Sequence, residues 1–455
     1  MRGGRPPAPP SRPYPVRAGL ATASPPVVSV REQDQLAPMS APVKESVVRA
    51  PGIPHLLATM LFCFSGFALL LPVSPAWAVH GGADAFGAGL VTAVLMAATV
   101  LTQLCVRVAL RRLGWTRTLV LGALLLGLPS LLQALSDHLV PVLVMTALRG
   151  AGFGIVTVCG ATAAAVLAPR GRQGAVIGLY GLAVALPQVV LTPAAPWLTD
   201  ALALPAVIAC GALPVLALPW ARHLGRAVEA RTDAAATSDG PGPRAVRAPE
   251  VLRRIRRPLA VLLLVTAAGG AVLTFAPQFT ATPALAATAL LALTGTAALA
   301  RWGCGELADR VALRPLTGAL ALTAGAGLAL TAFAVGSQGA PVGALLGGLL
   351  LLGVAYGGLQ SLTLVQAFAY AGAENRHATS VAWNIGYDAG TGVGSLLLGV
   401  AAQVATFAAG FATLAVLLAV AGAAVLLVGH TVSADAAEDG PRQAPGGRNR
   451  PPGKP

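Results

Sequence analysis

Twelve apolar blocks, each long enough to cross a lipid bilayer as a helix, constrain this chain more than any other feature of its sequence. The blocks are apolar on all sides, whereas the helices of soluble proteins are usually amphipathic. Because 55% of the residues are hydrophobic and only 11% are charged, we predict an all-α polytopic membrane protein with twelve transmembrane helices. The expected spans cover 55–79, 86–106, 118–135, 139–167, 174–198 and 202–221, then 258–279, 282–300, 316–335, 342–370, 379–404 and 407–428.

A long polar interval separates the first six spans from the last six. We expect a disordered cytoplasmic N-tail at 1–51, a six-helix bundle at 52–222, a flexible cytoplasmic linker at 223–257, a second six-helix bundle at 258–430 and a disordered cytoplasmic C-tail at 431–455. The segments 149–172 and 353–376 have the same length, and each is an apolar span that ends in a short basic loop. This internal repeat predicts two related bundles.

The basic residues lie on one side of the predicted membrane. Of the 31 Lys and Arg residues, all but Arg149 fall in the two tails or in alternate loops. Such a bias marks the cytoplasmic side, so we expect both termini in the cytoplasm. Topology therefore accounts for the net charge of +14, and we expect no nucleic-acid partner.

One carboxylate, Asp388, stands in the middle of an apolar span. An isolated charge there costs about 3 kcal/mol on insertion scales, so such a residue usually faces a polar cavity or a partner. At helical spacing, Asn384, Tyr387 and Asp388 share one face. We favour a proton carrier, protonated in one access state and ionised in the other; the alternative is a structural partner of Arg149 or of hydroxyl and amide groups. For Arg149 itself, the structural role is the favoured one.

Other polar side chains inside the predicted spans are candidates for a central cavity. They either bind a substrate or bond only to neighbouring helices. Together with Asn384, Tyr387 and Arg149, the candidates are Gln360, Tyr356, Tyr180, Gln188 and Gln103. The scarcity of charge among them favours a neutral, cationic or lipophilic substrate.

The loop after the eighth block reads Gly-Glu-Leu-Ala-Asp-Arg at 305–310. It resembles the G-x-L-A-D-R loop motif of the major facilitator superfamily, at the position of that family's second copy. The resemblance implies a role in cytoplasmic gating, through salt bridges, for Gly305, Asp309, Arg310 and Arg314.

Three further stretches resemble patterns of this family. At 149–154 the sequence RGAGFG is similar to the R-x-x-x-G-x-G pattern associated with proton coupling. The Trp-Asn-x-x-Tyr-Asp-x-Gly stretch at 383–390 looks like that of the sugar-efflux and drug-efflux permeases. The first copy of the loop motif is degraded, because Arg111 stands where the family has Asp, and the fifth block holds only a poor version of the antiporters' Gly-Pro-rich motif.

The resemblance implies a secondary transporter in which two bundles rock around a central site. We expect proton-coupled export of a small organic molecule, such as a drug, a sugar or a metabolite, with Asp388 as the coupling group. One alternative is uptake or facilitated diffusion of a sugar or an organic anion, with Arg149 as the anion-binding residue. An alternative of another class is a transporter-like sensor or a membrane enzyme.

The sequence holds no zinc-protease motif, no phosphate-binding loop and no pair of membrane carboxylates. Its five cysteines show neither metal-ligand spacing nor a disulfide framework. We therefore expect no enzymatic activity and no cofactor or metal. The expected partners are a small-molecule substrate, protons and the lipid bilayer, and the expected state is a monomer in the plasma membrane of a bacterium.

Overall fold

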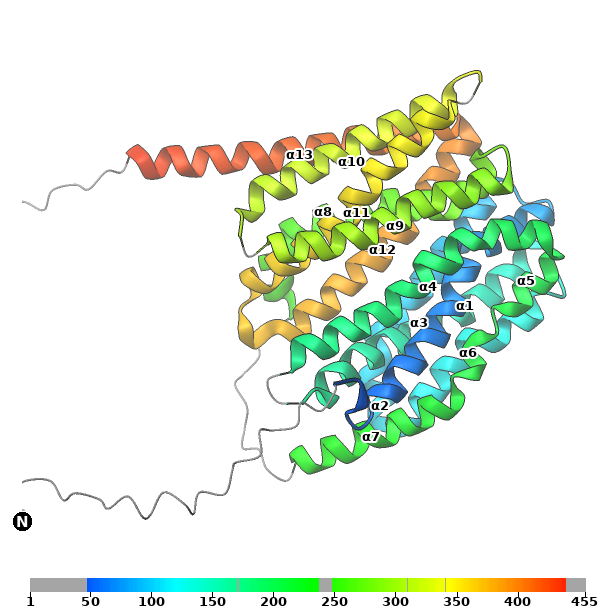
Figure 1. Cartoon of the computed structure of the whole chain (residues 1–455), viewed down its shortest axis with the longest axis vertical. Helices are drawn as coiled ribbons and strands as arrows, with labels where there is room; N and C mark the ends of the chain where they lie inside the picture. The colour runs from blue at the N-terminus through cyan, green and yellow to red at the C-terminus, as the bar shows by residue number, and fades with distance from the viewer. Residues whose placement is uncertain (1–46, 170–171, 237–247, 309, 340, 439–455) are drawn as a thin grey trace, which may run out of the picture. The chain divides into compact units, whose positions relative to one another are not determined.

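The computed structural model describes residues 47–169, 172–236, 248–308, 310–339 and 341–438, and nearly all of them are helical (Figure 1). These ranges contain no β-strand. The helices are η2 Val47–Arg49, α1 Ile53–His80, α2 Ala85–Gln133, α3 Leu139–Leu167, α4 Gln173–Ala201, α5 Leu204–Cys210, α6 Leu213–Leu216, α7 Leu218–Ala236, α8 Ala248–Phe279, α9 Pro283–Leu307, α10 Leu313–Gly336, α11 Val342–Ala371, η3 Ala373–Asn375, α12 Arg376–Val404 and α13 Phe407–Glu438.

Within the described residues, ten helical segments are long and apolar enough to cross a membrane. One of them, Leu204–Thr232, is assembled from α5, α6 and most of α7. The 49 residues of α2 suffice for two crossings. The 29 residues of α12 also have the necessary length, but polar residues such as Asn384 and Asp388 lower its apolarity. The prediction of an all-α membrane fold is confirmed, and the described helices are consistent with twelve crossings.

The second and third spans are joined without the expected basic loop. The helix continues through Arg107 and Arg111, and only Gly114 leaves the helical conformation, with φ 78° and ψ 171°. Glycine takes this left-handed φ without the steric cost that a Cβ adds. Beyond the kink, the Thr116 N–H and hydroxyl donate to the Glu229 carboxylate of α7 at 3.1 and 3.0 Å. A side chain from α7 thus satisfies a backbone N–H that the break leaves without a helical partner.

The helices also extend beyond other limits expected from composition. The predicted linker at 223–257 is helical up to Ala236 and again from Ala248. At the C-terminal end, α13 continues past the expected limit at 430 and ends at Glu438. The N-tail predicted to be disordered, 1–51, is described only from Val47, where η2 begins. Residues 1–46, and 439–455 of the predicted C-tail at 431–455, lie outside the described residues.

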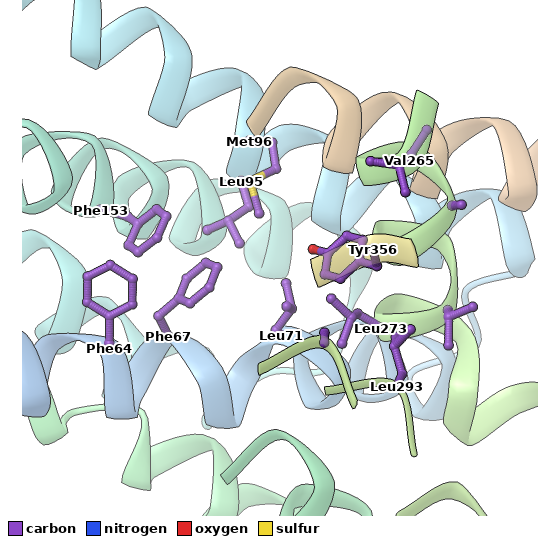
Figure 2. Packing of buried hydrophobic residues seen from close by; sticks show 14 of the residues in the cluster. Phe64, Phe67, Leu71, Leu95, Met96, Phe153, Val265, Leu273, Leu293 and Tyr356 are labelled. Atoms are coloured by element: carbon purple, nitrogen blue, oxygen red, sulfur yellow. The ribbon is translucent and has the colours of Figure 1, made fainter. Parts of the chain in front are cut away.

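Aromatic rings from α1 and α3 pack together in the core of the first six spans. The ring centroids of Phe67 and Phe153 are 3.9 Å apart with an interplanar angle of 2°, and Phe64 meets Phe153 edge-on at 5.3 Å. Figure 2 shows these three rings close together, with Leu71 and Leu95 between them and Tyr356. Lipid tails are as apolar as these side chains, so close van der Waals contact stabilises this core more than the removal of apolar surface from water does.

Small residues bring α2 and α12 into backbone contact. A Cβ on Gly89 would lie 2.6 Å from the Ser395 carbonyl oxygen, and one on Gly399 would lie 2.7 Å from the carbonyl oxygen of Ala85. Only glycine allows helices to approach this closely. The contacts pair the start of α2 with the end of α12, so the two helices run antiparallel.

A hydroxyl from α8 joins this contact. The Thr274 hydroxyl donates to the Thr92 hydroxyl of α2 at 3.0 Å and lies 2.9 Å from the Ser395 hydroxyl of α12. One residue from each of three helices is therefore hydrogen-bonded at the end of the bundle where α2 begins. We call this the closed end, and we call the opposite end, which carries Arg111 and Arg257, the basic end.

Candidate functional site

Gln103 of α2 and Asp388 of α12 meet in the interior, 4% and 5% exposed respectively. The Gln103 side-chain amide donates from Nε2 to Oδ2 of Asp388 at 2.7 Å and also reaches the Thr157 hydroxyl of α3 at 3.2 Å. The pair lies on the basic-end side of the glycine contacts between the two helices. It therefore links a helix of the first six spans to a helix of the last six.

Asp388 has no cationic partner among the described residues, whose salt bridges are all located elsewhere. An ionised carboxylate in such a place bears the full desolvation cost, offset in part by one amide hydrogen bond. Proton binding removes that cost, and proton release to water restores the charge. A buried carboxyl with no cation beside it is therefore chemically able to bind and release a proton.

Arg149 forms its hydrogen bond with another residue and not with the Asp388 carboxyl. Its side chain, 1% exposed, donates from Nη1 to the Ser74 hydroxyl of α1 at 3.1 Å. Its Nε has no hydrogen-bond partner among the described atoms. Of the partners expected for Asp388, the structure shows an amide, and Arg149 instead ties α3 to α1.

Arg301 is not among the site residues predicted from the sequence. The predicted span ends at residue 300, which leaves Arg301 in a loop, but α9 continues to Leu307 and includes it. Its guanidinium donates from Nη2 to Oε1 of Gln360 on α11. Periodicity offered a signal, because Leu293 and Ala297 are buried in α9 and Arg301 follows at the next helical interval on the same face.

Two tyrosines join α11 to α12 beside this arginine. The hydroxyls of Tyr356 and Tyr387 are 2.7 Å apart. Trp383 stacks on Tyr387 with ring centroids 5.8 Å apart, and its Nε1 donates to the Thr363 hydroxyl at 3.2 Å. We call Tyr356, Tyr387 and Trp383 the aromatic cluster.

Some hydrogen-bond donors around the aromatic cluster have no acceptor among the described atoms. The Nε2 of Gln360 is buried and has no acceptor among the described atoms. Arg301 bonds Gln360, which follows Tyr356 by about one helical turn on α11. A guanidinium has five N–H donors, so this corner retains donors for a further acceptor. Tyr387 directly precedes Asp388, so α12 carries two members of the aromatic cluster, Trp383 and Tyr387, close in sequence to the buried carboxyl.

Three predicted cavity residues are not brought into this arrangement. The side-chain amides of Asn384 and Gln188 donate to carbonyl oxygens of their own helices, at Ser380 and Val184, over 2.8 and 3.3 Å. Tyr180 packs near Gly160, where an added Cβ would lie 3.2 Å from its ring. These contacts match the helix-packing alternative for polar residues in bundles.

The gating motif is only partly visible. Gly305, Arg310 and Arg314 are exposed, and none of the salt bridges between described residues involves the two arginines. Asp309, to which a gating salt bridge was assigned, lies outside the described residues. The gating role of these four residues stays a prediction.

Comparison with known proteins agrees with this architecture. A family model described as Major Facilitator Superfamily matches residues 56–395. A mutant of the nucleoside transporter NupG has a TM-score of 0.64 at 12% identity, and the match covers 82% of this chain and 99% of that one. A mutant peptide transporter POT in complex with sulfate has a TM-score of 0.65 at 14% identity, and that match covers 84% of this chain and 95% of the other.

A third solved structure is similar as well. It is a bacterial homologue of the human lysosomal transporter Spinster in an inward-facing and occupied conformation, with a TM-score of 0.59 at 14% identity, covering 83% of this chain and 96% of that one. No curated protein matches the chain. Likeness at such low identity shows the fold, and the substrates of these transporters do not carry over.

Proposed function

Because the chain belongs to the major facilitator superfamily, we propose that it is a proton-coupled secondary transporter that exports a small organic molecule and that Asp388 carries the coupled proton. Membership of this family makes the chain a multi-pass membrane transporter, and the membrane-enzyme alternative is set aside on that ground. The coupling, the direction and the substrate class are the proposed parts.

The observation that supports the coupling proposal is the hydrogen bond from Gln103 to Asp388. It joins helices from the two halves of the chain, at the basic-end limit of their glycine contacts. In alternating access, the two halves separate on one side of the membrane and close on the other. When α2 and α12 separate at the closed end, Asp388 loses its amide donor and meets water from that side.

Protonation then becomes linked to the access state. In the state seen here, Asp388 is buried and bonded across the halves; in the opposite state, it faces water and can exchange its proton there. A proton shifts the equilibrium between these states only by as much as its affinity for Asp388 differs between them. The change in burial and in hydrogen bonding at this one carboxyl supplies that difference.

Export is the direction favoured by the resemblance of the stretch at 383–390 to efflux permeases. The topology we propose has both termini in the cytoplasm of a bacterium, two six-helix bundles at 52–222 and 258–430, and a monomer in the plasma membrane. The one-sided placement of basic residues supports the orientation. In this orientation the basic end is cytoplasmic, and the closed end faces outward.

Arg301 favours a second candidate, transport of an organic anion. Its guanidinium lies beside Gln360 and the aromatic cluster, where a carboxylate would accept from the guanidinium and an apolar or aromatic body would pack on Trp383. In the sequence-based alternative Arg149 held the anion, but Arg149 is buried against Ser74. Arg301 is the better-placed cation.

The proposal is tested by proton flux in inside-out vesicles that hold an imposed pH gradient, challenged with drugs, sugars and organic acids. We expect at least one compound to dissipate the gradient with the unmodified chain and not with Asp388→Asn. The matched control is Asp200→Asn, which removes an exposed carboxylate at the end of α4 and should leave the flux unchanged. Transport of a compound without any proton signal would refute the coupling.

A further inference from the structure

A pocket of about 280 Å³ lies at the basic end of the last six spans, among α8, α10, α11 and α13. Arg257 of α8 and Arg314 of α10 line it where the apolar stretches of these two helices begin, whereas Tyr370 of α11 and Val425 of α13 line it where the apolar stretches of those helices end. All four helices therefore reach the pocket at the same level. This position is separate from the Asp388 carboxyl and from the aromatic cluster.

The pocket is polar at one side and apolar along its depth. Arg257 and Arg314 are exposed, and neither takes part in a salt bridge or hydrogen bond with another described residue. By contrast, the neighbouring Arg253 and Arg254 both bond Glu250. From Arg257, the wall continues along α8 to Leu264, about 10 Å deeper at 1.5 Å per residue.

The wall formed by α13 is apolar as well. On α13 it consists of small apolar side chains, Ala421, Ala424 and Val425. The buried amide of Gln366 donates to the Thr317 hydroxyl at 2.7 Å, so these two polar groups satisfy each other. The unpaired charge in the pocket is thus positive and lies at its mouth, while the deeper part offers apolar contact.

We infer that this pocket binds one anionic phospholipid of the leaflet at the basic end. The phosphate lies between the guanidinium groups of Arg257 and Arg314, which donate charge-assisted hydrogen bonds to it. The first part of an acyl chain packs along α8 and α13. Two facts favour a lipid over a free anion: the site is at the end of membrane-spanning helices, and its depth is apolar.

The test measures lipid binding to the purified full-length chain by native mass spectrometry, without substrate. The probes are short-chain phosphatidylglycerol, phosphatidylcholine of the same chain length and inorganic phosphate. The test variant is Arg257→Gln/Arg314→Gln. The control is Arg253→Gln/Arg256→Gln, which removes two positive charges from the exposed surface of α8 outside the pocket.

We expect the unmodified chain and the control to bind phosphatidylglycerol in preference to phosphatidylcholine. At about 1 kcal/mol for each basic residue near an anionic headgroup, the test variant should bind phosphatidylglycerol roughly tenfold to thirtyfold more weakly. A second variant, Ala421→Phe, fills the apolar part and keeps both arginines, and it should weaken phosphatidylglycerol binding as well.

Three results would overturn the inference. Equal binding of the two lipids would remove the role of charge. Unchanged binding in both the arginine and the Ala421→Phe variants would place the lipid elsewhere. Competition by inorganic phosphate as effective as by phosphatidylglycerol would show a simple anion site without a contribution from the acyl chain.

Discussion

Gln103 and Asp388 are 285 positions apart in the sequence, and the amide Nε2 of the first lies 2.7 Å from the carboxyl Oδ2 of the second. The bond connects two helices that come from different halves of the chain. It is also the hydrogen bond on which the proposed coupling rests, because separating the helices removes it. Both its energetic value and its role can be measured.

Substituting Gln103→Leu should destabilise the protein by roughly 1–3 kcal/mol, because a buried carboxyl loses its hydrogen-bond donor. The double variant Gln103→Leu/Asp388→Leu should recover much of that loss, since replacing both partners of a buried bond by apolar groups is often nearly neutral. Thermal unfolding of the four proteins in detergent gives the double-mutant cycle. Strict additivity of the two single effects would show that the side chains do not interact.

The close approach of α2 and α12 predicts opposite effects for two glycine substitutions. Gly89→Ala should be destabilising by about 1–3 kcal/mol, because its Cβ would lie 2.6 Å from the Ser395 carbonyl oxygen and the helices must shift. Gly178→Ala is the control, since open space surrounds that position, and it should be neutral or stabilising by up to about 1 kcal/mol. Thermal unfolding measures both, and equal effects would contradict the contact.

The position of Arg301 predicts that the binding of anionic compounds depends on its guanidinium, whereas the binding of neutral compounds does not. If the transported molecule carries a carboxylate, Arg301→Gln should weaken its binding by roughly tenfold to a hundredfold, because a hydrogen bond to a charged group is worth about 1.5–3 kcal/mol. Neutral compounds from the same panel should bind the variant as before. Arg256→Gln, an exposed arginine of α8, serves as the control in a binding assay by thermal shift. An equal loss for neutral and anionic compounds would indicate a structural role for Arg301.

A hydrogen bond between His80, the last residue of α1, and Asp137 predicts a pH dependence of stability. The His80 Nδ1 lies 2.9 Å from Oδ2 of Asp137, in the loop before α3. This hydrogen bond holds the pKa of Asp137 below its ordinary value. A lowered carboxyl pKa adds stability that is present above the unfolded-state value, about 3.9, and lost as the pH falls through the folded-state value.

The unmodified chain should therefore have a higher Tm than Asp137→Asn at neutral pH. The difference should persist down to about pH 5 and disappear in the strongly acidic range, below about pH 4. Asp84→Asn is not a suitable control because the Asp84 side chain caps α2, so Asp200→Asn is used instead. A difference that stays constant at every pH would mean that the carboxylate charge is not involved.

The fold was predictable from the sequence because its signals are local. A span needs only a sufficient number of consecutive apolar residues. The twelve blocks fall almost entirely on helices, although two of them share α2 and the sixth is divided among α5, α6 and α7. The predicted ends of the spans were wrong where the helix continues beyond the last apolar residues. Arg111 and Arg301 are charged but lie inside continuous helices, because α2 breaks only at Gly114 and α9 ends only at Leu307.

The candidate site was only half predictable, for a related reason. The sequence singled out Asp388, Gln103, Tyr356 and Tyr387 one by one, since each polar residue in an apolar span is conspicuous. The pairing of Gln103 with Asp388, and of Tyr356 with Tyr387, depends on how helices pack against each other. No local pattern encodes that packing. The sequence also indicates Arg149 as an alternative partner of Asp388, but the Arg149 side chain bonds Ser74.

The measurement that tests the central claim most directly compares two transport modes of Asp388→Asn in proteoliposomes, with a compound identified in the vesicle screen. In exchange, labelled compound moves against unlabelled compound with no pH gradient; in accumulation, an imposed pH gradient drives it uphill. If Asp388 carries the proton, Asp388→Asn keeps exchange and loses accumulation, because asparagine preserves the size of the side chain and cannot bind or release a proton. If the variant still accumulates the compound against its gradient, another group couples the proton and the assignment of Asp388 is wrong.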